Sequence, residues 1–163
     1  MVAVGDGWWL SPVAGGHLGV EPKELYGAYL DTMKYMATDD FNFVKASGLK
    51  EALIQLSKTK PIVLVTNSKE DDACSILRAL GLQDVFMDAV YAAEKPAQTA
   101  DVFQMLLERY HVDPEKAVAI GDNFINEITP ALLLGMKAIY IQTYGHRETE
   151  GRLRVVKSLA EVI

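Results

Sequence analysis

The chain has almost no cysteine: Cys74 is the only one in 163 residues. A single cysteine cannot form an internal disulfide, and no other Cys or His stands near it at the spacing of a metal site. This pattern fits a reducing compartment. The N-terminal residues also lack the basic segment and long apolar run of a signal peptide. We therefore expect a cytoplasmic protein.

Long hydrophobic runs and an excess of basic residues are missing as well. The longest apolar stretches, residues 62–65 and 131–134, fall far short of the roughly 20 residues needed to cross a bilayer. The 16 basic and 22 acidic residues leave a net charge of −6. A surface of that charge disfavours nucleic acid and anionic lipid. We expect neither as a partner, and we expect any phosphate to be bound at one local site.

Several familiar site motifs are absent too. The sequence has no Gly-rich Lys-Ser phosphate loop and no dinucleotide-binding fingerprint. None of the three histidines stands near a Ser or Cys with a third partner, so a hydrolase triad is not supported.

The sequence does contain short apolar runs that alternate with helical patterns. Half of the residues are hydrophobic, and the length suits one domain. The runs lack polar alternation, which is typical of strands buried on both faces of a parallel sheet. Helices between them would supply the crossovers. The sequence predicts an α/β, Rossmann-like parallel sheet with helices on both faces. The strands are expected at 2–4, 62–65, 85–90, 118–120 and 138–141, and the helical patterns at 49–56, 73–80, 102–110 and 125–134.

One segment interrupts this alternation. Residues 8–47 contain a Gly-rich loop and an amphipathic helix over about 22–36. We interpret residues 8–47 as a small helical insertion, and residues 1–7 with 48–163 as the core domain. The apolar stripe of the helix is expected to pack on the core, and its exposed part could serve a homodimer.

Polar side chains follow three of the predicted strands. Thr66 and Asn67 come after one strand, Lys95 after the next, and Asp122 with Glu127 after the third. Ligands of open parallel sheets bind beyond the carboxyl ends of the strands. Thr, Asn and Lys can contact phosphate oxygens, while carboxylates can hold Mg²⁺. Each motif alone could be a turn or helix cap, but the three in order predict a phosphate site.

These motifs resemble those of the haloacid dehalogenase-like (HAD) superfamily, most of whose members are Mg²⁺-dependent phosphohydrolases on a Rossmann-like sheet. The likeness covers about residues 48–145, and the insertion at 8–47 resembles a reduced form of the small helical cap found in many family members. Leu64 to Ser68 resembles the family's second motif, Glu94 to Pro96 the third, and Gly121 to Glu127 the acidic fourth. The resemblance implies an Mg²⁺ cofactor and a small phosphorylated molecule as substrate.

The resemblance also implies roles for individual residues. Asp6, Thr66 and Lys95 would be catalytic, and Thr66, Asn67 and Lys95 would bind the phosphoryl group. The metal ligands would be Asp6, Asp122 and Glu127, with Glu127 in the outer shell.

The first motif departs from the family pattern and leaves two alignments open. If Asp6 and Gly7 align with the second acid and its glycine, Val4 takes the nucleophile position and no aspartyl-phosphate can form. If Asp6 is the nucleophile, Trp8 replaces the second acid, as an aromatic residue does in the dehalogenase branch.

Three functions follow from these alternatives. The first is a Mg²⁺-dependent phosphatase acting on a small phosphomonoester, with activity impaired if the nucleophile is missing. The second is a non-catalytic protein that binds phosphate, metal or a partner. The third is a 2-haloacid dehalogenase, which Thr66 and the acidic motif suit less well.

Overall fold

The computed structural model describes residues 15–36, 38, 41, 43, 47–142, 148–158 and 161–162. The chain divides into two compact units, Met1–Phe43 and Val44–Ile163. The strand predicted at 2–4 and the candidate residue Asp6 lie outside the described residues. The assignment of residues 1–7 to the core therefore stays a prediction.

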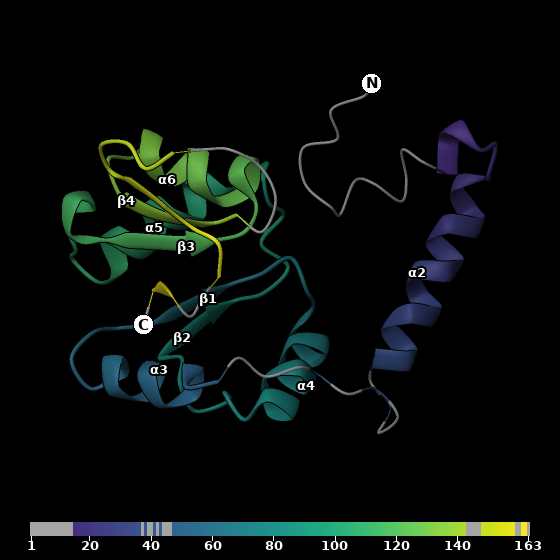
Figure 1. Ribbon diagram of the computed structural model, residues 1–163, viewed down its shortest axis with the longest axis horizontal. Helices are drawn as coiled ribbons and strands as arrows, with labels where there is room; N and C mark the ends of the chain where they lie inside the picture. The colour runs from purple at the N-terminus through teal and green to yellow at the C-terminus, as the bar shows by residue number, and fades with distance from the viewer. Residues whose placement is uncertain are drawn as a thin grey trace. The chain divides into compact units, whose positions relative to one another are not determined.

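The first unit contains the helix that the sequence predicts. Helix α2 spans Pro22–Met36 and is a single straight helix in Figure 1. None of its residues is buried. The rings of Tyr26 and Tyr29 stack with centroids 6.3 Å apart, which is within the range of favourable aromatic pairs.

The second unit contains only parallel strand pairs among its described strands. Strands β1 (Val63–Val65) and β2 (Asp88–Val90) pair with each other. Strands β3 (Val118–Gly121), β4 (Lys137–Ile141) and β5 (Leu153–Val156) form a second sheet in that order. Within each sheet the strands end at the same edge, as Figure 1 shows. The loops that follow β1 and β2 are therefore neighbours.

Helices connect these parallel strands, so the α/β organisation predicted from the sequence is confirmed. Helix α4 (Glu70–Leu80) links β1 to β2 and ends at Gly81, whose φ of 71° suits a residue without a side chain. A π-helical turn, η3, and the short helix α6 link β3 to β4. The remaining helices are α3 (Leu49–Ser57), α5 (Thr99–Arg109) and the 3₁₀ turn η2 (Pro114–Lys116). The bounds of η3 and α6 are Phe124–Ile128 and Thr129–Leu133.

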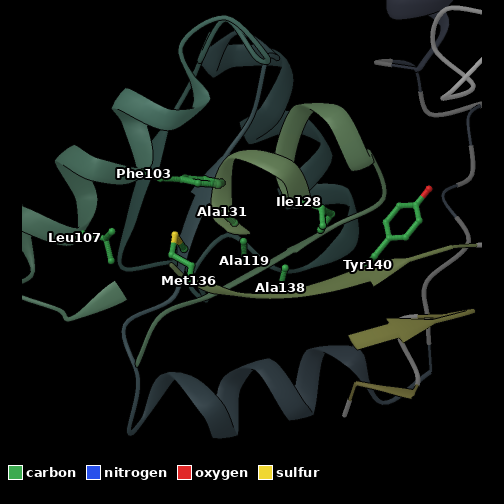
Figure 2. Close-up of a cluster of buried hydrophobic side chains, with 8 residues drawn as sticks. All are labelled: Phe103, Leu107, Ala119, Ile128, Ala131, Met136, Ala138 and Tyr140. Carbon is green, nitrogen blue, oxygen red and sulfur yellow. The ribbon is translucent and has the colours of Figure 1, made fainter. Parts of the chain in front are cut away.

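The main core lies between α5, α6 and the sheet formed by β3 and β4. Figure 2 shows its side chains, with Phe103 from α5 close to Ala131 from α6. Ile128 and Ala131 have no exposed surface, and burying an aliphatic side chain of the size of Ile128 contributes about 1.5–3 kcal/mol. The cluster is made of Phe103, Leu107, Ala119, Ile128, Ala131, Met136, Ala138 and Tyr140. It fixes the end of β3, where the acidic motif begins.

The structure corrects the sequence prediction at the acidic motif. The spacing over 125–134 predicts one α-helix with Ile125 facing the sheet, but η3 replaces its first turn. Ile125 is 60% exposed, because the wider π turn changes which residues share a face. The same turn orients Glu127, whose carboxylate accepts the backbone N–H of Asn123.

Two other differences concern β5 and α3. Strand β5 was not predicted, because its four residues include the charged Arg154 and lack a long apolar run. Helix α3 was predicted to cover a sheet, yet it contains no buried residue. None of the helices in the described ranges is long and apolar enough to cross a membrane.

Candidate functional site

The loops that follow β1 and β2 are joined by backbone hydrogen bonds. The N–H of Ala93 donates to the carbonyl of Thr66 at 2.9 Å, and the N–H of Ala92 donates to the carbonyl of Ser68, also at 2.9 Å. These bonds continue the parallel pairing of β1 with β2 past the end of the strands. They bring the predicted Thr66 motif beside the loop that carries Lys95.

The hydroxyl of Thr66 is available as a hydrogen-bond donor. Thr66 is half-buried, and its Oγ1 accepts the N–H of Ser68 at 3.1 Å. A threonine hydroxyl has one proton in addition to its acceptor lone pairs. Since the hydroxyl accepts from Ser68, its own proton can point to an anion beyond the strand end.

The side chain of Asn67 contacts the backbone of Lys95 rather than open solvent alone. The N–H of Lys95 donates to Asn67 Oδ1 at 2.7 Å, and Asn67 Nδ2 donates to the carbonyl of Lys95 at 2.9 Å. Within the described residues, the backbone N–H of Asn67 has no hydrogen-bond acceptor. That backbone N–H is therefore the donor of Asn67 best placed to meet an anion.

The ammonium group of Lys95 links the end of β1 to the acidic motif. Its Nζ donates to the carbonyl of Val65 at 3.1 Å and forms an ion pair with Oε1 of Glu127. The Lys95 side chain is 9% exposed and the Glu127 side chain 16%. Charges this far from water are costly unless they are paired and hydrogen-bonded. Pairing with Glu127 therefore offsets the free-energy cost of burying the Lys95 ammonium at the strand ends.

Glu127 is held by the acidic motif itself. Its second oxygen, Oε2, accepts the backbone N–H of Asn123 at 3.1 Å. Gly121 lies so close that a Cβ at this position would collide with the Glu127 carboxylate. The Gly of the motif is thus required by a close approach rather than by its φ.

Asn123 shapes the turn that presents Glu127. Its Oδ1 accepts the N–H of Asn126 at 2.7 Å, which caps η3. Asn123 is 4% exposed, and its Nδ2 has no hydrogen-bond partner within the described part of the chain. Sequence reasoning did not single out this residue, although its position directly after Gly121 and Asp122 was a usable signal.

Asp122 differs from Glu127 in being exposed. Among the described residues it has no hydrogen-bond or ion-pair partner for its carboxylate. No group of three His, Cys, Asp or Glu residues within the described ranges could hold a metal ion. Mg²⁺ usually needs only one or two carboxylates besides water and substrate phosphate. A free carboxylate at Asp122 therefore fits a Mg²⁺ ligand, whereas each oxygen of Glu127 already has one partner in the protein.

The structure thus connects three of the six predicted site residues, Asn67, Lys95 and Glu127, in one hydrogen-bond network. Hydrogen bonds run from Val65 through Lys95 and Glu127 to Asn123, and Asn67 joins the same network. Asp122 adjoins the network in the chain without bonding to it. The predicted Asp6 lies outside the described residues, so its place relative to Lys95 stays a prediction.

A second charged cluster lies at the other end of β2. Asp88 Oδ2 accepts from Arg109 NH1 at 2.5 Å and from the Tyr110 hydroxyl at 3.0 Å. The hydrogen bond from Tyr110, followed by that from Arg109, holds the pKa of Asp88 below its ordinary value of 3.8. This cluster fastens the start of β2 to the end of α5 and has no contact with the Lys95 network among the described residues.

Comparisons with solved structures place this fold among hydrolases and phosphatases. A HAD phosphatase from Thermococcus onnurineus is 20% identical, with a TM-score of 0.61 over 95% of this chain and 86% of that one. A 2-haloacid dehalogenase from Pseudomonas syringae is 25% identical, with a TM-score of 0.60 over 88% of this chain and 62% of that one. A putative HAD hydrolase from Bacillus subtilis, bound to magnesium, is 21% identical, with a TM-score of 0.59 over 71% of this chain and 52% of that one.

The present chain thus spans about half the length of the Bacillus protein. No curated protein matches it. The family model for haloacid dehalogenase-like hydrolases matches residues 15–141. That range includes the Thr66, Lys95 and Asp122 motifs and starts after Asp6. On this match and on the fold, the chain belongs to the haloacid dehalogenase-like hydrolase family.

Proposed function

We propose that the protein is a Mg²⁺-dependent phosphatase that acts on a small phosphomonoester. The observation that carries this proposal is the position of the Lys95 ammonium, which is bound at once to Val65 at the end of β1 and to Glu127 of the acidic motif. A fixed positive charge at the ends of parallel strands is suited to stabilise a phosphoryl group during transfer.

The residues around Lys95 supply complementary donors. The Thr66 hydroxyl proton and the backbone N–H of Asn67 would donate to the phosphoryl oxygens. Lys95 would neutralise the charge that develops on these oxygens during transfer. Glu127 would keep the ammonium in place rather than contact the substrate, since both of its oxygens have partners in the protein.

Asp122 is the described residue that would hold Mg²⁺, because its carboxylate is exposed and unpaired within the described ranges. Bound Mg²⁺ would neutralise phosphate charge as a Lewis acid. The predicted second ligand, Asp6, would complete the site.

Asp6 is also our proposed nucleophile. Its carboxylate oxygen would form a bond to phosphorus as the bond from phosphorus to the ester oxygen breaks, and the leaving oxygen would take a proton from water and depart as the alcohol. Water would then hydrolyse the aspartyl-phosphate to inorganic phosphate and regenerate the carboxylate. In the other alignment Val4 takes this position, and the protein would bind phosphate without turnover.

The experiment is hydrolysis of an aryl phosphate by the purified chain, with Mg²⁺ and with EDTA, beside an Asp6→Asn variant. We expect Mg²⁺-dependent turnover that the substitution abolishes. Turnover that survives the substitution removes Asp6 from the mechanism. Absence of turnover on a broad panel of phosphomonoesters rejects the phosphatase in favour of a phosphate-binding protein.

A dehalogenase is the second candidate, favoured by the 25% identity to the Pseudomonas syringae enzyme. The same Asp6 carboxylate would then attack the halogen-bearing carbon of a short 2-haloacid and release halide. Halide release without Mg²⁺, together with no phosphate release, would favour this candidate over the phosphatase.

A further inference from the structure

We propose that the side chain of Asn67 is a positioning residue that acts through Lys95 and does not bind the phosphoryl group itself. The effect on turnover rests on the proposed phosphatase function, while the effect on Lys95 itself does not. In this proposal the backbone N–H of Asn67 would bind the anion, and the side-chain amide of Asn67 would hold the Lys95 backbone in place.

The contact between the two residues uses both ends of the amide. Asn67 accepts from the N–H of Lys95 at 2.7 Å and donates to its carbonyl at 2.9 Å. Both distances lie in the range of good hydrogen bonds. Within the described residues, these are the only hydrogen bonds that the backbone of Lys95 makes. The backbone of the proposed catalytic lysine therefore depends on one side chain 28 residues away.

The loop that carries Lys95 needs such support. Ala92 and Glu94 have φ values of 46° and 50°, in the left-handed region that residues with a Cβ rarely adopt. Such conformations persist only where surrounding contacts hold them. The loop is fixed at two points, because the N–H of Ala93 donates to the Thr66 carbonyl and the N–H of Ala92 donates to the Ser68 carbonyl. At Lys95, within the described residues, the hydrogen bonds of the Asn67 amide tie the backbone to the loop after β1.

The ammonium of Lys95 has two acceptors on different elements. It must reach the carbonyl of Val65 and the carboxylate of Glu127 at the same time. Val65 belongs to β1, whereas Glu127 belongs to η3, which follows β3 of the other sheet, so a small shift of the Lys95 backbone would weaken one of the contacts. By fixing that backbone, Asn67 would keep the side chain at 9% exposure and the positive charge in the site.

The test measures how well Lys95 is protected from an amine reagent. The intact chain is treated briefly with acetic anhydride, and the acetylation rate of Lys95 is read by peptide mass spectrometry relative to the exposed Lys50. Asn67→Ala removes both hydrogen bonds. Asn67→Asp keeps the acceptor for the Lys95 N–H and loses the donor. Ser68→Ala is the matched control, because its side chain makes no hydrogen bond within the described ranges.

We expect Lys95 in Asn67→Ala to react at least about tenfold faster than in the parent chain, as the loss of two hydrogen bonds allows the loop to open more often. Asn67→Asp should be intermediate, and Ser68→Ala unchanged. Asn67→Asp serves as the test variant if Asn67→Ala does not fold. Lys95 protection equal to that of the parent in both Asn67 variants would overturn the proposal.

Turnover gives a second, separate readout. For a phosphomonoester, a positioning role predicts a fall in kcat larger than the rise in KM, whereas direct substrate binding by the amide predicts the reverse. A parent chain without phosphatase activity would reject the proposed function, and the Lys95 protection data would still decide the role of Asn67.

Discussion

Lys95 and Glu127 form an ion pair that joins the end of β1 to the acidic motif after β3. Each partner has a further hydrogen bond to backbone, from Lys95 to the Val65 carbonyl and from the Asn123 N–H to Glu127. The two charges are thus part of a network that links β1 of one sheet to the turn that follows β3 of the other.

The first prediction concerns the cost of breaking the pair. Because both side chains are nearly buried, Lys95→Met and Glu127→Gln should each lower the free energy of unfolding by about 2–4 kcal/mol. The loss in free energy of unfolding of the double variant should be about 1–3 kcal/mol smaller than the sum of the two single-variant losses. Urea unfolding of the four proteins measures this coupling.

The matched control is the pair formed by Lys34 and Asp31, whose side chains are 77% and 76% exposed. Lys34→Met should change stability by at most about 1 kcal/mol. Strict additivity of the Lys95 and Glu127 variants would show that the two side chains do not interact.

The second prediction concerns Gly121. A Cβ at this position collides with the Glu127 carboxylate, so Gly121→Ala should displace Glu127 and lower stability by about 1–3 kcal/mol. Thermal unfolding checks this. Gly27 lies in α2 with open space around it, so Gly27→Ala should be neutral or stabilising by up to about 1 kcal/mol. An equally stable Gly121→Ala protein would contradict the described approach of Glu127.

The third prediction separates metal binding from stability at Asp122. The carboxylate is exposed and has no partner within the described ranges, so Asp122→Asn should leave the free energy of unfolding within about 0.5 kcal/mol of the parent. It should weaken Mg²⁺ binding at least about tenfold, since an amide carries no charge. Titration calorimetry with Mg²⁺ measures the affinity. Unchanged Mg²⁺ affinity would exclude Asp122 as a ligand.

The fourth prediction concerns pH and the distant Asp88 cluster. Hydrogen bonds from Tyr110 and Arg109 keep the pKa of Asp88 in the folded protein below 3.8. A lowered folded-state pKa contributes stability that is present above about pH 4 and is lost as pH falls through the folded value. Asp88→Asn should therefore cost about 1 kcal/mol at neutral pH and progressively less below pH 4. An equal cost at neutral pH and below pH 4 would show that the charge of Asp88 does not contribute to stability.

Much of the fold follows from local patterns in the sequence. The run at 62–65 and the spacing over 22–36 predict β1 and α2, because a short apolar run and a 3.6-residue period are local signals. The π turn at Phe124–Ile128 is not predictable in this way. Its backbone depends on the Asn123 cap and on the burial of Ile128 in a core built from distant residues.

The site shows the same division. Thr66, Lys95 and Asp122 are predictable, since residue types that bind phosphate and metal follow three strands in order. The contacts of Asn67 and Glu127 are not, because they depend on which neighbour each side chain reaches. Asn67 turns to the Lys95 backbone, and both oxygens of Glu127 are taken by Lys95 and Asn123.

The central claim is that the ends of β1, β2 and β3 form one phosphate site around Lys95. The most direct measurement is a titration of the ¹⁵N-labelled chain with inorganic phosphate in the presence of Mg²⁺, followed by amide chemical shifts. We predict saturable shifts at residues 66–68, 94–95 and 121–123, and their loss in Lys95→Met. Shifts that are absent at these residues, or that gather around the open groove lined by Lys60, Pro61 and Met87, would contradict it.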